Sequence, residues 1–313
     1  MLAIKTISNK PTIFKREMLL MGTRFEFSVV GDNPQWADER VEEAIAEINR
    51  VEKLISAFND ESAVNEINRN AGIKPVKTNA EIFRLISRSL EISDLTHGSF
   101  DITYHTPGKE ENEENKKGQN IKKTLTADIN YKNVIIDTNA QTVFLKEKNM
   151  RIGFGSNSKG YAADRAKYIL QMAGVNSGVI NAGGDLITWG LQPDNEPWTV
   201  AAADAEQLQL TFSDIEIGNL AIATSINNAT LPAILSKNNF NTVNSKAGFP
   251  VSGIKSVSIL SPSAELSDSL SATVMLMGIN AGLYLINQLN QIACIIIDDQ
   301  NRVYTSKGVS IAN

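Results

Sequence analysis

The 313-residue sequence contains a single cysteine, only two histidines and few aromatic residues (6%). One cysteine cannot form an internal disulfide, and Cys294 lies in an apolar run, where a buried strand position is expected. No apolar run approaches eighteen residues, which argues against a transmembrane helix. Residues 1–17 lack the apolar core of a signal peptide. These absences leave the compartment of the protein open.

The charge balance is slightly acidic, with 30 basic and 35 acidic side chains, a net charge of −5 and a pI of about 5.3. Such a chain has no electrostatic signature of a nucleic-acid or anionic-membrane partner. The 42% hydrophobic and 21% charged residues are typical of a globular protein. The length suffices for one large domain or two closely joined ones.

The first half of the sequence predicts a strand followed by helices. A strand is expected over 18–31, with Phe25 and Phe27 on one face. Apolar residues at three- and four-residue spacing predict helices over 37–56 and 80–94. Residues 108–123 carry almost no apolar side chains, and we expect an exposed polar insertion. A hairpin is expected from strands 133–137 and 142–146.

The second half mixes helices and strands without a regular βαβ period. Helices are expected over 159–172, 268–277 and 279–289, the first ending before Gly174. Strands are expected near 178–181, 198–203, 207–213, 219–224, 255–260, 292–298 and 302–305. This order favours an α+β fold over a doubly wound parallel sheet.

Two segments suggest a pocket for a ligand that carries phosphate. Lys159-Gly160 opens a helix, and the N-terminus of a helix beside a lysine attracts anions. About twenty residues later an apolar strand ends in Asn181-Ala182-Gly183-Gly184-Asp185. Glycines at the end of a strand let the backbone approach a bulky ligand closely. Either segment alone is also compatible with an ordinary turn.

Other segments occur in a characteristic order along the chain. They are Met21-Gly22-Thr23, Ser56-Ala57-Phe58 with Ser62 and Asn68, Gly98-Ser99-Phe100-Asp101, Ser158-Lys159-Gly160-Tyr161-Ala162-Ala163-Asp164, Asn181-Ala182-Gly183-Gly184-Asp185, Ala223-Thr224-Ser225, Gly248-Phe249-Pro250-Val251, and Asp268-Ser269-Leu270 leading to Met277-Gly278. This series resembles the FAD:protein FMN transferase family, also called the ApbE family, over residues 18–305. The resemblance implies a single domain of mixed sheets flanked by helices around a nucleotide-binding cleft.

The resemblance also implies an activity. Members of the family bind FAD, use Mg²⁺ to cleave its pyrophosphate, and transfer FMN to a threonine or serine hydroxyl of a target protein, releasing AMP. Some members hydrolyse FAD to FMN and AMP instead. Many members are exported or membrane-anchored. A cation that neutralises phosphate oxygens is what such a reaction requires.

The resemblance assigns roles to particular residues. Lys159 and Asp268 are the expected catalytic residues, and the expected metal ligands are Ser158, through its main-chain carbonyl, Asp268 and Thr273. The expected contacts to the flavin nucleotide are Met21, Phe58, Asp101, Lys159, Asn181, Ala182, Gly183, Gly184, Asp185, Thr224 and Ser225.

Several of these residues also have a purely structural interpretation. Phe58 would stack on a ring of FAD or be a core aromatic residue. A lysine that begins a helix, such as Lys159, is commonly solvated, and Asp185 suits a turn or a cap. Asp268 would bind metal or form the N-cap of the helix that it precedes.

The chain departs from the family pattern at four positions that matter for catalysis. Gly153 replaces a carboxylate, Asn241 a histidine and Asn244 an aspartate. Ala272 stands where the family has a metal-ligating threonine, and Thr273 is the next residue along. Each substitution removes a charge or a ligand, while the glycines are retained.

We therefore hold two hypotheses. In the first, the protein is an Mg²⁺-dependent FAD:protein FMN transferase whose activity is reduced or lost. In the second, it is a non-catalytic relative that binds a flavin nucleotide or another protein. An unrelated α+β enzyme is a third, weaker alternative.

Overall fold

The computed structural model describes residues 11–57, 59–105, 129–155, 157–203, 214–227, 253–307 and 309. The chain divides into two compact units, the larger formed by residues 1–50 and 156–313 and the smaller by residues 51–155. The sequence did not indicate this division. The predicted polar insertion at 108–123 lies outside the described residues.

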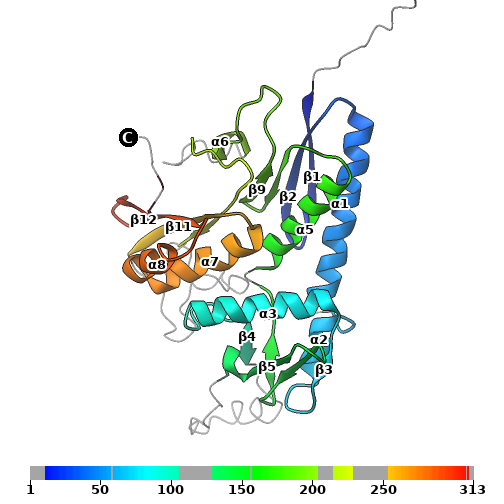
Figure 1. The fold of residues 1–313 in the computed structure, drawn as a ribbon, viewed down its shortest axis with the longest axis vertical. Coiled ribbons are helices and arrows are strands. Elements are labelled where there is room, and N and C mark those ends of the chain that lie inside the picture. Colours follow the sequence, from blue (N-terminus) through cyan, green and yellow to red (C-terminus); the bar gives the residue numbers. More distant parts are fainter. Residues whose placement is uncertain are drawn as a thin grey trace, which may run out of the picture. The chain divides into compact units, whose positions relative to one another are not determined.

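The larger unit is built on an eight-stranded sheet in which every neighbouring pair of strands is antiparallel (Figure 1). In spatial order the strands are β1 (Thr12–Leu20), β2 (Thr23–Gly31), β8 (Gly178–Ala182), β9 (Asp185–Trp189), β10 (Ala221–Ile226), β11 (Ile254–Ser261), β12 (Ala293–Asp298) and β13 (Val303–Thr305). The order follows the sequence apart from the long excursion between β2 and β8.

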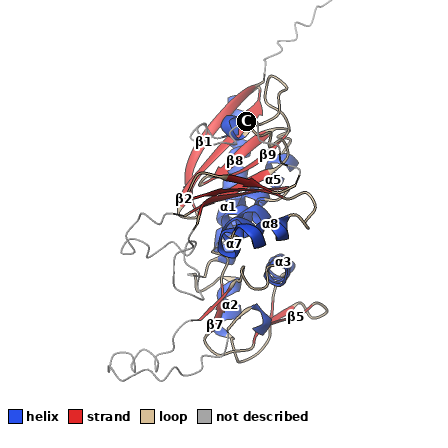
Figure 2. Ribbon diagram, turned by 90° about the vertical axis from the view of Figure 1, so that its left-hand side faces the viewer, coloured by secondary structure: helices blue, strands red, loops and turns tan. Residues whose placement is uncertain are grey.

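Helices pack on one face of this sheet. They are α5 (Ser158–Met172), against β8 and β9, α7 (Ala264–Met277), against β9, β10 and β11, and α8 (Ile279–Ile286), against β12. Figure 2 shows α7 and α8 on the same side of the strands. The helix α1 (Pro34–Ile55) follows β2.

A separate apolar cluster belongs to the same unit. It includes Trp198 and Val200, near the short helix α6 (Val200–Ala203), together with Ile222 of β10. Since successive side chains of a strand point to opposite faces, Ala221 and Ala223 face away from this cluster. These alanines allow α7 to approach β10 closely. The sheet therefore has helices on one face and this apolar cluster on the other.

The smaller unit contains the helices α2 (Ala63–Arg69) and α3 (Ala80–Leu95) and a short 3₁₀ helix at Tyr131–Asn133. A three-stranded sheet has the order β3 (Val76–Lys77), β6 (Thr142–Leu145), β5 (Val134–Asp137). A two-stranded sheet pairs β4 (Thr103–His105) with β7 (Met150–Ile152).

The predicted α+β class is confirmed, and so is the buried strand position of Cys294. The single strand over 18–31 is wrong, because the chain reverses at Met21-Gly22, where both residues have positive φ (50° and 74°). The strand over 198–203 is also wrong, since Val200–Ala203 is helical. The strand at 207–213 lies outside the described residues.

The helix predicted to begin at Asp268 begins instead at Ala264, with Ser263 as its N-cap. The serine hydroxyl accepts a hydrogen bond from the Leu266 N–H, which gives an acceptor to one of the otherwise unpaired amides of the first turn. The interpretation of Asp268 as an N-cap is therefore wrong. The sequence analysis also missed α2 and β9.

The contact between α5 and α7 is closest at Gly160. A Cβ atom at this position would lie only 2.3 Å from the Ala264 carbonyl oxygen. Only glycine permits this approach, because the obstacle is backbone and cannot move aside without shifting α7. The glycine of the Lys159-Gly160 pair thus has a packing role.

We predict that Gly160→Ala destabilises the protein by about 2 kcal/mol. Helix propensity alone would favour alanine by about 1 kcal/mol, so the sign separates the two effects. Urea unfolding followed by circular dichroism measures the change. Gly155→Ala is the matched control, since nothing lies within 4 Å of a Cβ there. Equal stability of Gly160→Ala and the wild type would contradict the close approach.

Candidate functional site

Two tight turns lie side by side at one end of the larger sheet. Gly183 and Gly184, with φ of 72° and 100°, connect β8 to β9, and the Asn181 side-chain oxygen accepts the Gly184 N–H at 2.7 Å. The Gly183 N–H donates to the Arg24 carbonyl at 2.9 Å, so this turn adjoins the β1–β2 turn that contains Met21. A Cβ on Gly183 would lie 2.6 Å from the Thr23 hydroxyl oxygen. Glycine is required here by conformation and by space.

Asp185, the first residue of β9, links three elements. Its carboxylate accepts a hydrogen bond from Lys159 Nζ at 3.0 Å and from the Thr224 N–H at 3.2 Å. Lys159 belongs to the first turn of α5, and Thr224 to β10. The side chains of Lys159 and Asp185 are 30% and 11% exposed. Asp185 is therefore more than a turn residue, since it holds an ammonium group in place.

Asp268 faces the same α5 terminus from α7. Its Oδ2 accepts the Gly160 N–H at 3.2 Å, and its side chain is buried. The carboxylate thus caps a helix, although the helix is α5 and not its own. This arrangement brings Lys159, Asp185 and Asp268 together, and we call these three residues the charged cluster.

Burial governs the protonation of the charged cluster. It raises the pKa of Asp268 to about 7, an effect that the Asp185 charge strengthens and that Lys159 and the Gly160 N–H oppose. Burial likewise raises the pKa of Asp185, against the pull of Lys159. Burial would lower the pKa of Lys159, but Asp185 and Asp268 outweigh it, so the pKa is raised. Lys159 accordingly keeps its positive charge at neutral pH.

Hydroxyl groups surround the charged cluster. Ser225 and Ser271 share a hydrogen bond of 2.9 Å, and Thr224 and Ser258 share one of 2.8 Å. The Thr273 hydroxyl is buried and donates to the Ser269 carbonyl one turn back. Ser271 is an α7 hydroxyl that meets Ser225 of β10, and sequence reasoning missed it. Its spacing of three residues from Asp268 would have been a usable signal.

Asp164 ends the Ser158–Asp164 motif, from which no site role was expected for it. Its carboxylate accepts hydrogen bonds from the Ala264 and Glu265 N–H groups, both at 2.9 Å, and from the Ser263 hydroxyl at 2.8 Å. Asp164 of α5 therefore caps α7, while Asp268 of α7 caps α5. The two helices thus cap each other. In each helix the amide that is capped and the aspartate that caps the other helix are four residues apart, Gly160 and Asp164 in α5, Ala264 and Asp268 in α7.

The remaining predicted residues are not part of this arrangement. Asp101 belongs to the smaller unit, where its carboxylate accepts the N–H groups of Thr103 and Tyr131. Phe58, Asn241 and Asn244 lie outside the described residues. The structure describes how Lys159, Asp185 and Asp268 are arranged, while the ligand contacts expected of Phe58 and Asp101 stay predictions.

Few side chains near Asp268 are of the types that ligate a metal ion. Within the described residues, no group of three or more histidine, cysteine, aspartate or glutamate side chains could hold a metal ion. Mg²⁺, however, is commonly bound by one or two carboxylates together with water and substrate phosphates. One buried carboxylate among hydroxyl oxygens therefore fits an Mg²⁺ that shares its ligands with a phosphate-bearing substrate.

A model of the ApbE family matches residues 21–296. The FAD:protein FMN transferase of Buchnera aphidicola subsp. Schizaphis graminum is 23% identical over 263 residues, which are 81% of this chain and 77% of that protein. The Escherichia coli K12 protein of the same name is 20% identical over 284 residues, covering 88% and 80%.

Solved structures support the same fold. The flavinyl transferase ApbE of Pseudomonas stutzeri matches with a TM-score of 0.72 and 20% identity, over 95% of this chain and 96% of that one. The ApbE protein of Thermotoga maritima matches with a TM-score of 0.69 and 22% identity, over 95% and 97%. No helix in the described part of the chain has the length and apolar character to cross a membrane.

We predict that Asp164→Ala lowers the free energy of unfolding by about 2 kcal/mol, because three donors of the α7 terminus lose their acceptor. Asp164→Asn keeps one acceptor oxygen and should cost less. Asp194→Ala is the control, since that carboxylate accepts only the Glu196 N–H in an exposed turn. Urea denaturation ranks the variants; an Asp164→Ala cost no larger than that of Asp194→Ala would refute the capping role.

We predict a coupling of about 1–2 kcal/mol between Lys159 and Asp185, because removing either partner leaves the other partly buried and unpaired. The double-mutant cycle uses Lys159→Met, Asp185→Asn and the double variant. Additive effects would mean that the ion pair contributes nothing to stability.

Proposed function

The chain belongs to the ApbE family, and from this membership we propose that it binds FAD and transfers the FMN half to a serine or threonine hydroxyl of a target protein. One observation carries the proposal: the charged cluster of Lys159, Asp185 and Asp268 sits at the N-terminus of α5, beside two glycine turns. The relatives named as FAD:protein FMN transferases support the same assignment.

The charged cluster suits the pyrophosphate of FAD. Lys159 supplies a permanent positive charge on a side chain that is 30% exposed, and Asp185 holds its ammonium group at a defined position. The Gly183-Gly184 turn offers backbone without side chains, which a bulky nucleotide can approach. In this proposal Met21, Asn181, Ala182, Thr224 and Ser225 contact the nucleotide.

Asp268, the main-chain carbonyl of Ser158 and a nearby hydroxyl of α7, from Thr273 or Ser271, would hold Mg²⁺. When bound, the ion neutralises charge that develops on the phosphate oxygens. In the transfer step the acceptor hydroxyl oxygen bonds to the phosphorus of the FMN half. The bond from that phosphorus to the bridging oxygen breaks, AMP leaves with the oxygen, and the hydroxyl proton passes to solvent. With water as acceptor the products are FMN and AMP.

A non-catalytic, nucleotide-binding function is the second candidate, and two observations favour it. Ala272 places a methyl group where the family pattern has a hydroxyl. At Gly153 a Cβ would lie 3.2 Å from Cε1 of Tyr104, so the tyrosine ring occupies the space in which a carboxylate side chain would begin. Both substitutions leave the charged cluster itself unchanged, so FAD binding is expected in either case.

We predict that the protein releases AMP from FAD in the presence of MgCl₂, and that Asp268→Asn lowers the rate at least about 100-fold. Chromatographic separation of FAD, FMN and AMP measures the rate. Calorimetric titration with FAD checks that Asp268→Asn still binds the nucleotide. EDTA should suppress the reaction of the wild type.

Ala272→Thr restores a hydroxyl and serves as the matched variant. A faster release of AMP in Ala272→Thr supports a transferase that the substitution has slowed. FAD binding without AMP release in both proteins would overturn the transferase proposal and leave the non-catalytic one. Absence of FAD binding would overturn both.

A further inference from the structure

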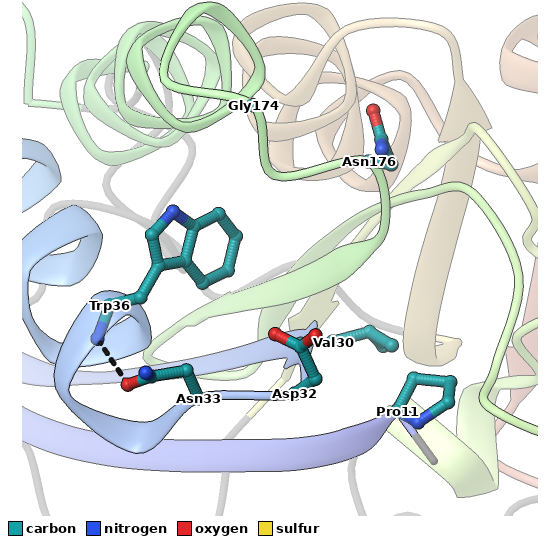
Figure 3. Close-up of a pocket in the computed structure, with 8 residues that line it drawn as sticks. Pro11, Val30, Asp32, Asn33, Trp36, Gly174 and Asn176 are labelled. Atoms are coloured by element: carbon teal, nitrogen blue, oxygen red, sulfur yellow. Dashed lines mark hydrogen bonds between the residues drawn. The ribbon is translucent and has the colours of Figure 1, made fainter. Parts of the chain in front are cut away.

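A cavity lies in the larger unit, away from the charged cluster. It has a volume of about 470 Å³, within the range of small-ligand pockets. Its walls come from the end of β2, the first turn of α1 and the segment that follows α5 (Figure 3). Trp36, Asp32 and Asn176 are the side chains that give it chemical character.

Trp36 is held at this cavity by its surroundings. The Trp36 backbone N–H donates to the Asn33 side-chain oxygen at 3.0 Å, which fixes the start of α1. A Cβ at Gly31 would lie 2.9 Å from Cζ3 of the indole, so the ring rests directly against a backbone that has no side chain. The half-buried ring therefore presents a fixed aromatic surface to the cavity.

The Asp32 carboxylate points into the cavity below the indole ring (Figure 3). Neither Asp32 nor the Asn176 side chain has a hydrogen bond or ion pair within the described residues. Among the residues that the structure describes, no lysine or arginine lines the cavity. The nearby arginines are already paired, Arg16 with Asp38 and Glu42, and Arg40 with Glu39 and Glu43.

The two helix ends at the cavity have opposite polarity. At the start of α1, the positive end of a helix dipole, Pro34 has no N–H, and the Trp36 and Ala37 N–H groups bond to Asn33, so few donors remain for an anion. On the opposite wall the chain leaves the C-terminus of α5, the negative end of a helix dipole. The two dipoles oppose each other, so the Asp32 carboxylate and the Trp36 ring are the groups that favour positive charge.

We propose that this cavity binds an organic cation, an ammonium or guanidinium group, between the Asp32 carboxylate and the Trp36 ring. Cations bind the face of an indole ring through its quadrupole, and the carboxylate supplies the opposite charge. The Asn176 amide is positioned to accept or donate one further hydrogen bond. The cation belongs either to a free polyamine or to a basic side chain of another protein.

This site is separate from the proposed FAD site. Lys159 is in the first turn of α5, whereas the cavity begins at Gly174, just beyond its last turn. A helix of 15 residues is about 22 Å long, so the two sites lie at opposite ends of the same helix. Binding of the cation therefore requires neither FAD nor catalysis.

Tryptophan indole signals provide a direct test. The chain has three tryptophans. Trp189 and Trp198 are buried, and their indole N–H groups donate to the Val175 carbonyl and the Ser177 hydroxyl, respectively. Trp36 is thus the one that a surface ligand would perturb. We would titrate the ¹⁵N-labelled full chain with N-acetyl-arginine methylamide and, separately, with spermidine, and assign the Trp36 signal with Trp36→Phe.

We expect saturable shifts of the Trp36 indole signal alone, with millimolar affinity that falls as NaCl is added. Asp32→Asn should weaken binding at least about five-fold, and Trp36→Leu about three-fold or more. Glu66→Gln, an exposed carboxylate of the smaller unit, should have no effect. Tighter binding of the arginine mimic assigns the site to a protein side chain, and tighter binding of spermidine to a free polyamine.

Two results with the cations would overturn the proposal, and so would one with an anion. One is the absence of any shift with both cations. The other is an equal response of Asp32→Asn, which keeps the size and polarity of the side chain and should fold normally. Binding of inorganic phosphate at the Trp36 signal, in place of the cations, would likewise contradict the assigned charge.

Discussion

The exchange of carboxylates between α5 and α7 is the constraint on which the rest of the site depends. Asp164 of α5 accepts the first N–H groups of α7, and Asp268 of α7 accepts the Gly160 N–H of α5. Neither helix could satisfy these amides alone, because the first N–H groups of a helix have no partner within it. The exchange therefore fixes the crossing point of the two helices, and Gly160 makes the crossing close enough.

This crossing explains how three charged side chains are kept in a poorly solvated place. Burying charges is costly, and the cost is offset only when each charge has well-placed partners. Asp268 has the Gly160 amide, Asp185 has the Thr224 amide, and Lys159 bonds to Asp185. Burial of the Asp268 carboxylate at this crossing, strengthened by the Asp185 charge, raises the pKa of Asp268 to about 7. A site prepared in this way has its polar groups oriented before any ligand arrives.

Two of the substitutions of this chain, Gly153 and Ala272, lie among the described residues and take no part in that crossing. Gly153 and Ala272 each remove a polar group expected from the family pattern, yet neither contributes a side chain to the mutual caps or to the charged cluster. The Tyr104 ring fills the space beside Gly153. The architecture that positions Lys159 and Asp185 is thus independent of the polar groups that are missing at Gly153 and Ala272.

The sequence by itself determined the α+β class and most helices, because apolar periodicity is a local signal. The resemblance of its motifs to the ApbE family singled out Lys159, Asp185 and Asp268, which meet at the α5 terminus. The sequence did not reveal the turn at Met21-Gly22, where the positive φ of a methionine has no local signature. It also placed the start of α7 four residues too late, and one of the two interpretations that it left open for Asp268 was a cap of its own helix. Only the tertiary structure decided that Asp164 and Asp268 cap each other's helix, that Ser271 meets Ser225, and that Trp36 and Asp32 border one cavity. Those pairings join residues distant in the chain, and distance in space is set by packing, which no local pattern records.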